Sequence, residues 1–302
     1  MKILQAEHLG MCFGVRDAIA FAKTEAKARP LTILGEIVHN ETVLNELRTL
    51  GVRFEQNLPN VVTETLMVTA HGSSTRSIIT AKENGHRVLE ATCPLVHYAH
   101  ASLKKLVGAG FHPVVVGKRD HVEVRGLTGD FSECDVVLTP EEVDALQERS
   151  RFGVISQTTQ PIEKVRELVD RLRQKFPRSE VRFIDTVCQP TKQRQNAAVV
   201  LAKQADVVIV IGGANSNNTR ELVATCSKFC GRVYHVQSAN DLRGEWFEEA
   251  RTIGITAGTS TPDAVITSVE SSIHELTSAQ NIVGKNSWVT PYVKNLRSRY
   301  RL

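Results

Sequence analysis

Three cysteines in equivalent sequence contexts constrain this chain more than any other feature. Cys12, Cys93 and Cys188 each follow an apolar run and precede a helical pattern. Apolar residues recur at the spacing of a helix face between residues 15 and 22 and again between residues 96 and 106. The sequence therefore predicts one strand–cysteine–helix unit that occurs three times.

The similarity of the three units extends past the cysteines. Each helical pattern is followed by a second apolar run that ends in glycine, at Gly35, Gly117 and Gly212, at nearly the same distance from its cysteine. A third apolar run then ends in a polar loop that opens another helical pattern. Strands that alternate with helices indicate α/β units with parallel sheets. We therefore expect an α/β protein of three similar domains with pseudo-threefold symmetry.

The repeat also predicts the domain boundaries. The first α/β domain covers residues 1–93, the second 94–188 and the third 189–276, and residues 277–302 form a C-terminal tail. The third unit does not end in a strand–cysteine segment of its own. Residues 1–11 are therefore expected to complete the third domain, so that the chain closes on itself.

Composition excludes several classes of protein. The 302 residues are long enough for two or three domains, and 41% hydrophobic and 23% charged residues are ordinary for a globular chain. The net charge of +4 is small and no basic run occurs, so we expect no nucleic-acid partner. No apolar stretch approaches the ~20 residues of a membrane span, so no membrane partner is expected. The first residues read as a strand rather than a signal peptide, which predicts a cytoplasmic protein.

The six cysteines do not form the framework of a disulfide-rich domain, and in a cytoplasmic protein spaced cysteines favour metal binding or catalysis. Cys226 and Cys230 lie on an apolar helix face and are predicted to be core residues, and Cys134 is predicted to be structural. The three repeated cysteines should meet on one axis, because ligands of parallel sheets bind at the carboxyl ends of the strands.

An iron–sulfur cluster fits the three repeated cysteines better than zinc. Two cysteines separated by two residues, the usual zinc signature, do not occur. Three separated thiolates can hold a 4Fe-4S cluster and leave one iron without a protein ligand. Zinc held by three thiolates and a water remains open on spacing alone.

Polar residues occupy matching places at the strand ends. His39, His121 and Ser216 follow the three second-strand glycines at the same distance, and His71, Thr158 and Ser260 lie at the ends of the three third strands. Glu123, Asn217 and Asn218 lie beside them in the same loops. Histidines, hydroxyls and amides next to helix amino ends are suited to a phosphate or diphosphate.

Eight separated motifs resemble those of the LytB family of 4-hydroxy-3-methylbut-2-enyl diphosphate reductases. The match runs in unbroken order over residues 3–270 and consists of GMCFGV, GEIVHN, AHGSS, ATCPLV, HVEVRG, SQTT, the NSNN stretch and TAGTSTPD. The resemblance implies a trefoil of three α/β domains around a central 4Fe-4S cluster. It also implies the last step of non-mevalonate isoprenoid synthesis, with an allylic diphosphate as substrate and a ferredoxin or flavodoxin as electron donor.

The resemblance assigns roles position by position. Cys12, Cys93 and Cys188 match cluster ligands, and Glu123 matches the acid that delivers a proton. The residues that match diphosphate ligands are His39, His71, Ser216, Asn218 and Ser260. His121 matches a residue at the substrate, and Thr158 matches one that orients the substrate hydroxyl and the acid.

The chain departs from the family pattern at three positions. Asn217 stands where a serine is usual and is expected to contact the substrate, Val122 replaces a proline between His121 and Glu123, and Gln189 replaces a common aromatic residue. Alternatives to the reductase are a paralogue with another substrate, a dehydratase resembling quinolinate synthase and a cluster-bearing sensor without activity. The retained HVEVRG and AHGSS motifs argue against the dehydratase. The retained Glu123 and Thr158 argue against the sensor, since a sensor needs no proton donor.

Overall fold

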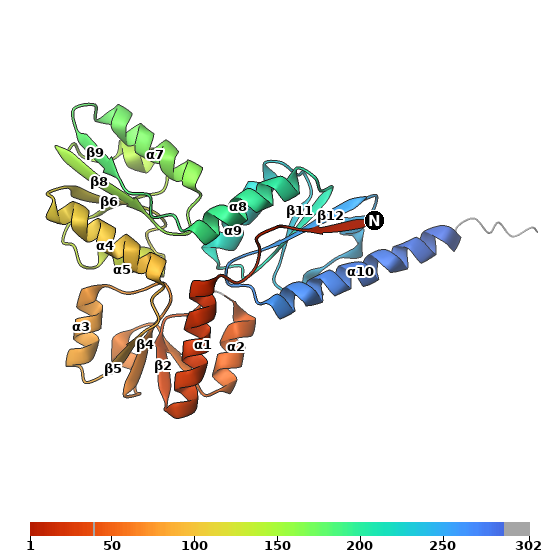
Figure 1. Ribbon diagram of the computed structural model, residues 1–302, viewed down its shortest axis with the longest axis horizontal. Coiled ribbons are helices and arrows are strands. Elements are labelled where there is room, and N and C mark those ends of the chain that lie inside the picture. Colours follow the sequence, from red (N-terminus) through yellow and green to blue (C-terminus); the bar gives the residue numbers. More distant parts are fainter. Residues whose placement is uncertain (39, 287–302) are drawn as a thin grey trace, which may run out of the picture.

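The computed structural model describes residues 1–38 and 40–286. These residues form three lobes around a common centre, and each lobe is built on one four-stranded sheet (Figure 1). All strand pairs in the three sheets are parallel. The predicted α/β class with three similar domains is confirmed.

The three sheets share one strand order. The first has the order β3 (Arg53–Glu55), β2 (Leu31–Leu34), β4 (Thr65–Val68) and β5 (Arg87–Glu90). The second has β7 (Asp135–Val137), β6 (His112–Val116), β8 (Arg151–Ser156) and β9 (Glu180–Phe183). The third has β11 (Val233–Val236), β10 (Val207–Ile211), β12 (Thr252–Ala257) and β1 (Lys2–Gln5).

The first strand of the chain takes the fourth place in the third sheet. β1 pairs in parallel with β12, with Lys2 opposite Thr252 and Gln5 opposite Ile255. β1 thus lies where β5 and β9 lie in the other two sheets. The first and the last strand of the described chain are therefore neighbours in one sheet. The segment that leads to Cys12 leaves this sheet at its carboxyl end, as do the loops that follow β10 and β12.

Helices connect the strands and cover the sheets. In the first lobe these are α1 (Phe13–Ala28), α2 (Glu41–Thr49) and α3 (Thr75–Glu83). In the second they are α4 (Pro94–Gly108), α5 (Val122–Thr128), α6 (Pro140–Asp144) and α7 (Ile162–Lys175). In the third they are α8 (Gln189–Ala202), α9 (Asn217–Ser227) and α10 (Asp263–Asn286). Short 3-10 turns are η1 (Leu58–Asn60), η2 (Ala239–Asp241) and η3 (Gly244–Phe247).

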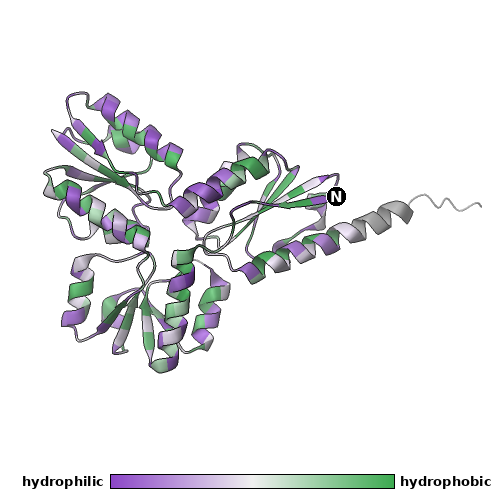
Figure 2. Cartoon of the chain, viewed as in Figure 1, coloured by the Kyte–Doolittle hydropathy of each residue, from purple (hydrophilic) through white to green (hydrophobic). Residues whose placement is uncertain are grey.

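The cores lie between the sheets and these helices. The strands are largely apolar and the helices are polar on their outer faces (Figure 2). All five residues of β10 are buried, as expected for a parallel strand with helices on both faces. Cys226 is fully buried in this core, in agreement with its predicted structural role. No helix in the described part of the chain is long and apolar enough to cross a membrane.

Helix starts follow the local sequence closely. Asn40 caps α2 and Ser74 caps α3 through their side chains, in the position where asparagine and serine are strongly preferred. Pro94 and Pro190 occupy the first turns of α4 and α8, where proline is tolerated. In the third domain, Pro262 lies just before the helix instead of in its first turn, because α10 begins at Asp263.

Two segments contain more helix than the sequence pattern indicates. The loop after Gly117 contains a helix, α5, so Glu123 lies in a first helical turn. α10 continues past residue 276, where the third domain was predicted to end. Of the predicted tail, residues 287–302 lie outside the described residues.

The first two lobes are joined through Asp130, which lies just after α5. Its carboxylate accepts hydrogen bonds from the backbone N–H groups of Thr75 at 3.0 Å and Arg76 at 2.9 Å, the first two residues of α3. Lys104 of α4 lies 3.6 Å from the same carboxylate. A carboxylate at a helix amino end satisfies free N–H groups and the helix dipole. Asp130 therefore fixes α3 to the second lobe.

Replacing Asp130 with alanine should lower the free energy of unfolding by about 1 kcal/mol, the usual loss when a helix amino end loses its cap. Burial alone would raise the pKa of Asp130, but the hydrogen bonds from Arg76 and Thr75 outweigh it and lower the pKa. A lowered pKa stabilises the fold above the pKa of the unfolded carboxyl, and this contribution is lost as the pH falls through the folded pKa.

Denaturant unfolding of the wild type, Asp130→Ala and Asp130→Asn across acidic and neutral pH measures both effects. The asparagine control keeps an acceptor but not the charge, so its deficit relative to the wild type should shrink as the pH is lowered. A deficit that does not change with pH would show that the charge of Asp130 is unimportant.

Candidate active site

The three repeated cysteines are held by the same backbone hydrogen bond in the three lobes. Each cysteine N–H donates to a carbonyl in the loop that follows the third strand of its sheet. The three bonds are Cys12 to Thr259 at 3.1 Å, Cys93 to Ala70 at 3.0 Å and Cys188 to Thr158 at 2.9 Å. The structure thus places the three residues in equivalent positions.

Each cysteine is also the residue that immediately precedes a helix. Cys12, Cys93 and Cys188 are the N-caps of α1, α4 and α8, with extended backbone and no capping bond from the side chain. α1 and α8 each have one end at the centre of the three lobes (Figure 1). Partial positive charge at a helix amino end favours a thiolate. The three thiols are therefore presented where anionic sulfur is stabilised.

The surroundings of Cys93 and Cys188 nevertheless oppose ionisation of these two thiols. Burial raises the pKa of Cys93, and the nearby Cys12 and Glu123 add to the increase. Burial likewise raises the pKa of Cys188 to about 11, although the Thr191 hydroxyl 3.0 Å from its sulfur acts in the opposite direction. Thiols of this kind bind as thiolates only when a metal supplies the compensating charge.

Gly14 allows the start of α1 to approach the Cys93 side chain closely. A Cβ atom at Gly14 would lie 2.5 Å from the Cys93 sulfur, which is far inside van der Waals contact. Gly14 follows Cys12 by two residues in the first turn of α1. The start of α1 therefore lies against the second ligand position, and any side chain at Gly14 would displace the Cys93 thiol.

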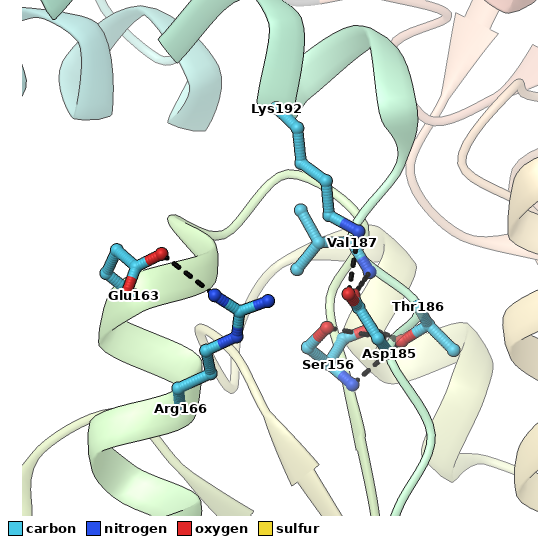
Figure 3. A network of polar contacts seen from close by, with 7 residues as sticks. All are labelled: Ser156, Glu163, Arg166, Asp185, Thr186, Val187 and Lys192. Carbon is cyan, nitrogen blue, oxygen red and sulfur yellow. Dashed lines mark hydrogen bonds and ion pairs between the residues drawn. The ribbon is translucent and has the colours of Figure 1, made fainter. Parts of the chain in front are cut away.

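A polar network holds the segment that leads to Cys188 (Figure 3). The Thr186 hydroxyl accepts from the Ser156 N–H at 2.9 Å and donates to the Ser156 carbonyl at 2.6 Å. Asp185 accepts from the Val187 N–H at 3.1 Å and pairs with Lys192 of α8 at 2.7 Å. These contacts connect the end of β8 to the start of α8, and Cys188 lies between them.

Glu123 is buried and is held by Thr158. The Thr158 N–H donates to one carboxyl oxygen at 2.6 Å and the Thr158 hydroxyl donates to the other at 3.0 Å. Glu123 is only 1% exposed, and this burial raises its pKa to about 7 despite the two hydrogen bonds. A carboxyl group with such a pKa is partly protonated near neutral pH and can act as a general acid.

Two histidines lie beside this acid. His121 caps α5, where its Nδ1 accepts from the Glu123 N–H at 3.2 Å. The rings of His71 and His121 pack edge to face with centroids 5.4 Å apart, although they come from different lobes. Val122, which replaces a proline of the family pattern, is the first residue of α5, a position where proline would also fit. His39 lies outside the described residues.

The third lobe contributes buried polar groups that lack protein partners. Asn218 accepts from the Thr259 N–H at 3.0 Å through Oδ1, but its Nδ2 has no hydrogen-bond partner among the described residues. The same holds for the buried Ser260 hydroxyl, which precedes α10 without capping it. Leaving such groups unpaired costs ~1–3 kcal/mol each, so both are suited to a ligand that accepts hydrogen bonds.

Ser216 and Asn217 have partners within the chain. Ser216 caps α9 by accepting from the Thr219 N–H at 3.3 Å. Asn217 donates through Nδ2 to Thr159 of the second lobe at 3.4 Å. The amide that replaces the family's serine therefore bridges two lobes at the edge of the site.

A cavity lies beside His121. Its volume is about 290 Å³, and residues of all three lobes line it, among them Gln56, His121, Arg125 and Arg220. Among the described residues, no three His, Cys, Asp or Glu side chains are gathered closely enough to hold a single metal ion. Cys12 nevertheless lies close enough to Cys93 and to Cys188 for its charge to raise the pKa of each.

Sequence reasoning missed two residues of the centre. Thr191 lies one helical turn after Cys188 and contacts its sulfur, and Arg194 is buried on the same helix near Cys12 and Cys188. The spacing from Cys188 along α8 could have indicated Thr191. Arg194 carried no comparable signal, because an arginine in a helix is normally exposed.

Comparison with known proteins places the chain in a family. The family model described as LytB protein matches residues 3–274. The 4-hydroxy-3-methylbut-2-enyl diphosphate reductase of Aquifex aeolicus is 36% identical over 286 residues, covering 93% of this chain and 98% of that protein. The enzyme of the same name from Pelobacter propionicus is 36% identical over 280 residues, covering 91% and 99%.

Two solved structures have the same fold. One is a structure of (E)-4-hydroxy-3-methyl-but-2-enyl diphosphate reductase, described as the terminal enzyme of the non-mevalonate pathway. It matches with a TM-score of 0.66 and 35% identity, covering 91% of this chain and 100% of that one. The reductase from Plasmodium falciparum matches with a TM-score of 0.83, covering 100% and 95%, and its 24% identity supports the fold alone.

Proposed function

Because this chain belongs to the LytB family, we propose that it is a 4-hydroxy-3-methylbut-2-enyl diphosphate reductase. It would remove the hydroxyl group of its allylic diphosphate substrate reductively, giving isopentenyl and dimethylallyl diphosphate in the last step of the non-mevalonate pathway. One observation carries the proposal. Thr158 contacts Cys188 through its carbonyl and Glu123 through its N–H and hydroxyl, so a proposed metal ligand and a proposed acid meet at one residue.

Cys12, Cys93 and Cys188 are the proposed ligands of a 4Fe-4S cluster. Their equivalent backbone bonds and their positions at three helix amino ends support a shared metal group, as do the raised pKa values of Cys93 and Cys188. A cluster of four irons spans more space than one zinc ion, which agrees with thiols that are not gathered around one point. When bound, the cluster supplies electrons and a Lewis-acidic iron.

The diphosphate is proposed to bind on the other side of the same centre. His39, His71, Ser216, Asn218 and Ser260 are the proposed ligands, with Asn217 beside them. The unpaired Asn218 Nδ2 and Ser260 hydroxyl support this assignment, since phosphate oxygens would accept the hydrogen bonds that the protein leaves unmade. His121 is proposed to contact the substrate, and Thr158 to orient its hydroxyl group.

Glu123 is the proposed proton donor. Hydroxide is a poor leaving group, so a proton must reach the departing oxygen as the C–O bond breaks. The buried carboxyl with a pKa of about 7 retains a proton near neutral pH, and Thr158 holds both of its oxygens in place.

The electron donor is assigned from the family alone, and the domain boundaries are assigned from the repeat in the sequence. We propose a ferredoxin or flavodoxin as electron donor, and the domains 1–93, 94–188 and 189–276 as units. A dehydratase, a sensor or a paralogue with another substrate is less well supported, because curated relatives at 36% identity over most of the chain are named as reductases. Anaerobic turnover of the allylic diphosphate with a strong reductant tests the proposal directly.

Replacing Cys93 with serine should strongly deplete iron in anaerobically purified protein, because a hydroxyl is a poor ligand for the cluster. The matched control is Cys226→Ser, since Cys226 is buried in the core of the third lobe. Iron and sulfide analysis per chain and the electron paramagnetic resonance spectrum measure the outcome. Full iron content in the Cys93 variant would rule out its assignment as a ligand.

Asn218→Ala and Ser260→Ala should raise KM for the diphosphate with little change in kcat. Each lost charge-assisted hydrogen bond is worth about 1.5–3 kcal/mol, or roughly ten- to a hundredfold in affinity. Ser227→Ala is the control, because Ser227 ends α9 and its exposed hydroxyl donates to the Val223 carbonyl of its own helix. Unchanged KM in both site variants would place the diphosphate elsewhere.

Glu123→Gln should lower kcat by about 10²–10⁴-fold with KM and iron content nearly unchanged, because the acid acts mainly in the transition state. Since the protonated form is the active one, wild-type kcat should be constant below pH ~7 and should fall as the pH rises through the pKa of Glu123. Glu123→Gln should lose that dependence.

Steady-state rates with saturating reductant, measured anaerobically from pH 6 to pH 9, test both parts of this prediction. Glu163→Gln, an exposed change in α7 that removes only the contact with Arg166, is the control (Figure 3). A Glu123→Gln enzyme with more than about a third of the wild-type kcat would show that another group delivers the proton.

A further inference from the structure

Arg194 is a buried cation at the centre of the molecule. It lies on α8 and is only 8% exposed, and it is the only lysine or arginine among the buried residues of the described chain. Long charged side chains almost always keep their charge in water or pair it with an opposite charge. A buried guanidinium therefore requires a specific reason.

Arg194 links the two segments that carry Cys12 and Cys188. Its Nε donates to the Gly10 carbonyl at 2.9 Å, and its Nη1 donates to the Pro190 carbonyl at 3.0 Å. Gly10 precedes Cys12 by two residues, and Pro190 follows Cys188 by two. The planar guanidinium thus connects the end of the N-terminal segment with the first turn of α8.

The two carbonyls do not neutralise the charge of Arg194. Among the described residues Arg194 forms no ion pair with a carboxylate, whereas the exposed arginines of the three lobes commonly do. Burial lowers the pKa of Arg194, and the negative charges that counter this effect are those of Cys12 and Cys188. An unpaired buried charge is costly, so the arrangement requires an anionic group at the thiols.

We propose that Arg194 is a positioning residue that holds the Cys12 and Cys188 segments together and supplies a fixed positive charge that favours the reduced state of the bound cluster. This inference rests on the proposed function, which places a cluster on these cysteines. Reduction adds negative charge to the cluster. A cation in a poorly solvated site lowers the free energy of the reduced state more than that of the oxidised state.

A purely mechanical role for Arg194 makes a different prediction. If its two hydrogen bonds mattered only as a clamp, removing the charge would change stability and iron loading but not the reduction potential of the clusters that remain. The reduction potential therefore separates the two roles, and it does not depend on turnover.

The experiment compares anaerobic holoenzymes of the wild type, Arg194→Gln, Arg194→Lys and Arg16→Gln in redox titrations followed by electron paramagnetic resonance. Arg16 is a matched control, because it lies one turn after Cys12 with a side chain that is 59% exposed, where solvent screens its charge. Arg194→Gln should lower the equilibrium constant for one-electron reduction at least tenfold, equivalent to about 59 mV. Arg194→Lys and Arg16→Gln should change it less than threefold.

The outcomes distinguish a failure of the proposed function from a failure of the electrostatic role of Arg194. A wild-type protein without iron would contradict the proposed function itself. A loaded Arg194→Gln variant with the wild-type potential would overturn the electrostatic role. If Arg194→Gln does not retain iron, wild-type iron content together with a wild-type potential in Arg194→Lys supports the role, because lysine keeps the charge without the planar clamp. A tenfold shift or loss of iron in Arg194→Lys overturns it.

Discussion

The hydrogen bond from each cysteine N–H to the loop after a third strand is the interaction on which the centre depends. In each sheet the fourth strand lies beside the third, so the chain that leaves the fourth strand runs next to that loop. The bond fixes the point at which the chain turns from a strand segment into a helix. Because this happens in three sheets, three helix amino ends and three thiols reach one centre.

This arrangement makes the centre dependent on contacts between distant parts of the chain. Cys12 is placed by a strand whose partner, β12, lies near the other end of the sequence. Cys93 depends on the close approach of Gly14, and Cys188 depends on the network around Thr186. Pairing over such sequence separations must overcome a large loop-closure entropy, so the centre is expected to form late in folding.

The central residues are not arranged for maximum stability. Glu123 and Arg194 are buried without the opposite charges that buried ions normally require, and the polar atoms of Asn218 and Ser260 lack partners. Each of these features opposes folding. A bound anionic group or substrate would relieve the cost at Arg194, Asn218 and Ser260, whereas Glu123 limits its own cost by retaining a proton. Local conflicts with stability are expected at functional sites, and here they coincide with the residues of the proposed reaction.

The sequence by itself determined the three-unit α/β organisation, the caps at Asn40 and Ser74 and the three matching cysteines, because periodicity, capping and repetition are local properties. It did not determine that Glu123 lies in a helix, since α5 is too short to show a periodic pattern. Only the tertiary structure brought Thr158 to Glu123, His71 to His121 and Arg194 to two cysteine segments. These contacts depend on how strands and lobes pack, and burial, which sets the charge state of each group, exists only once they have packed.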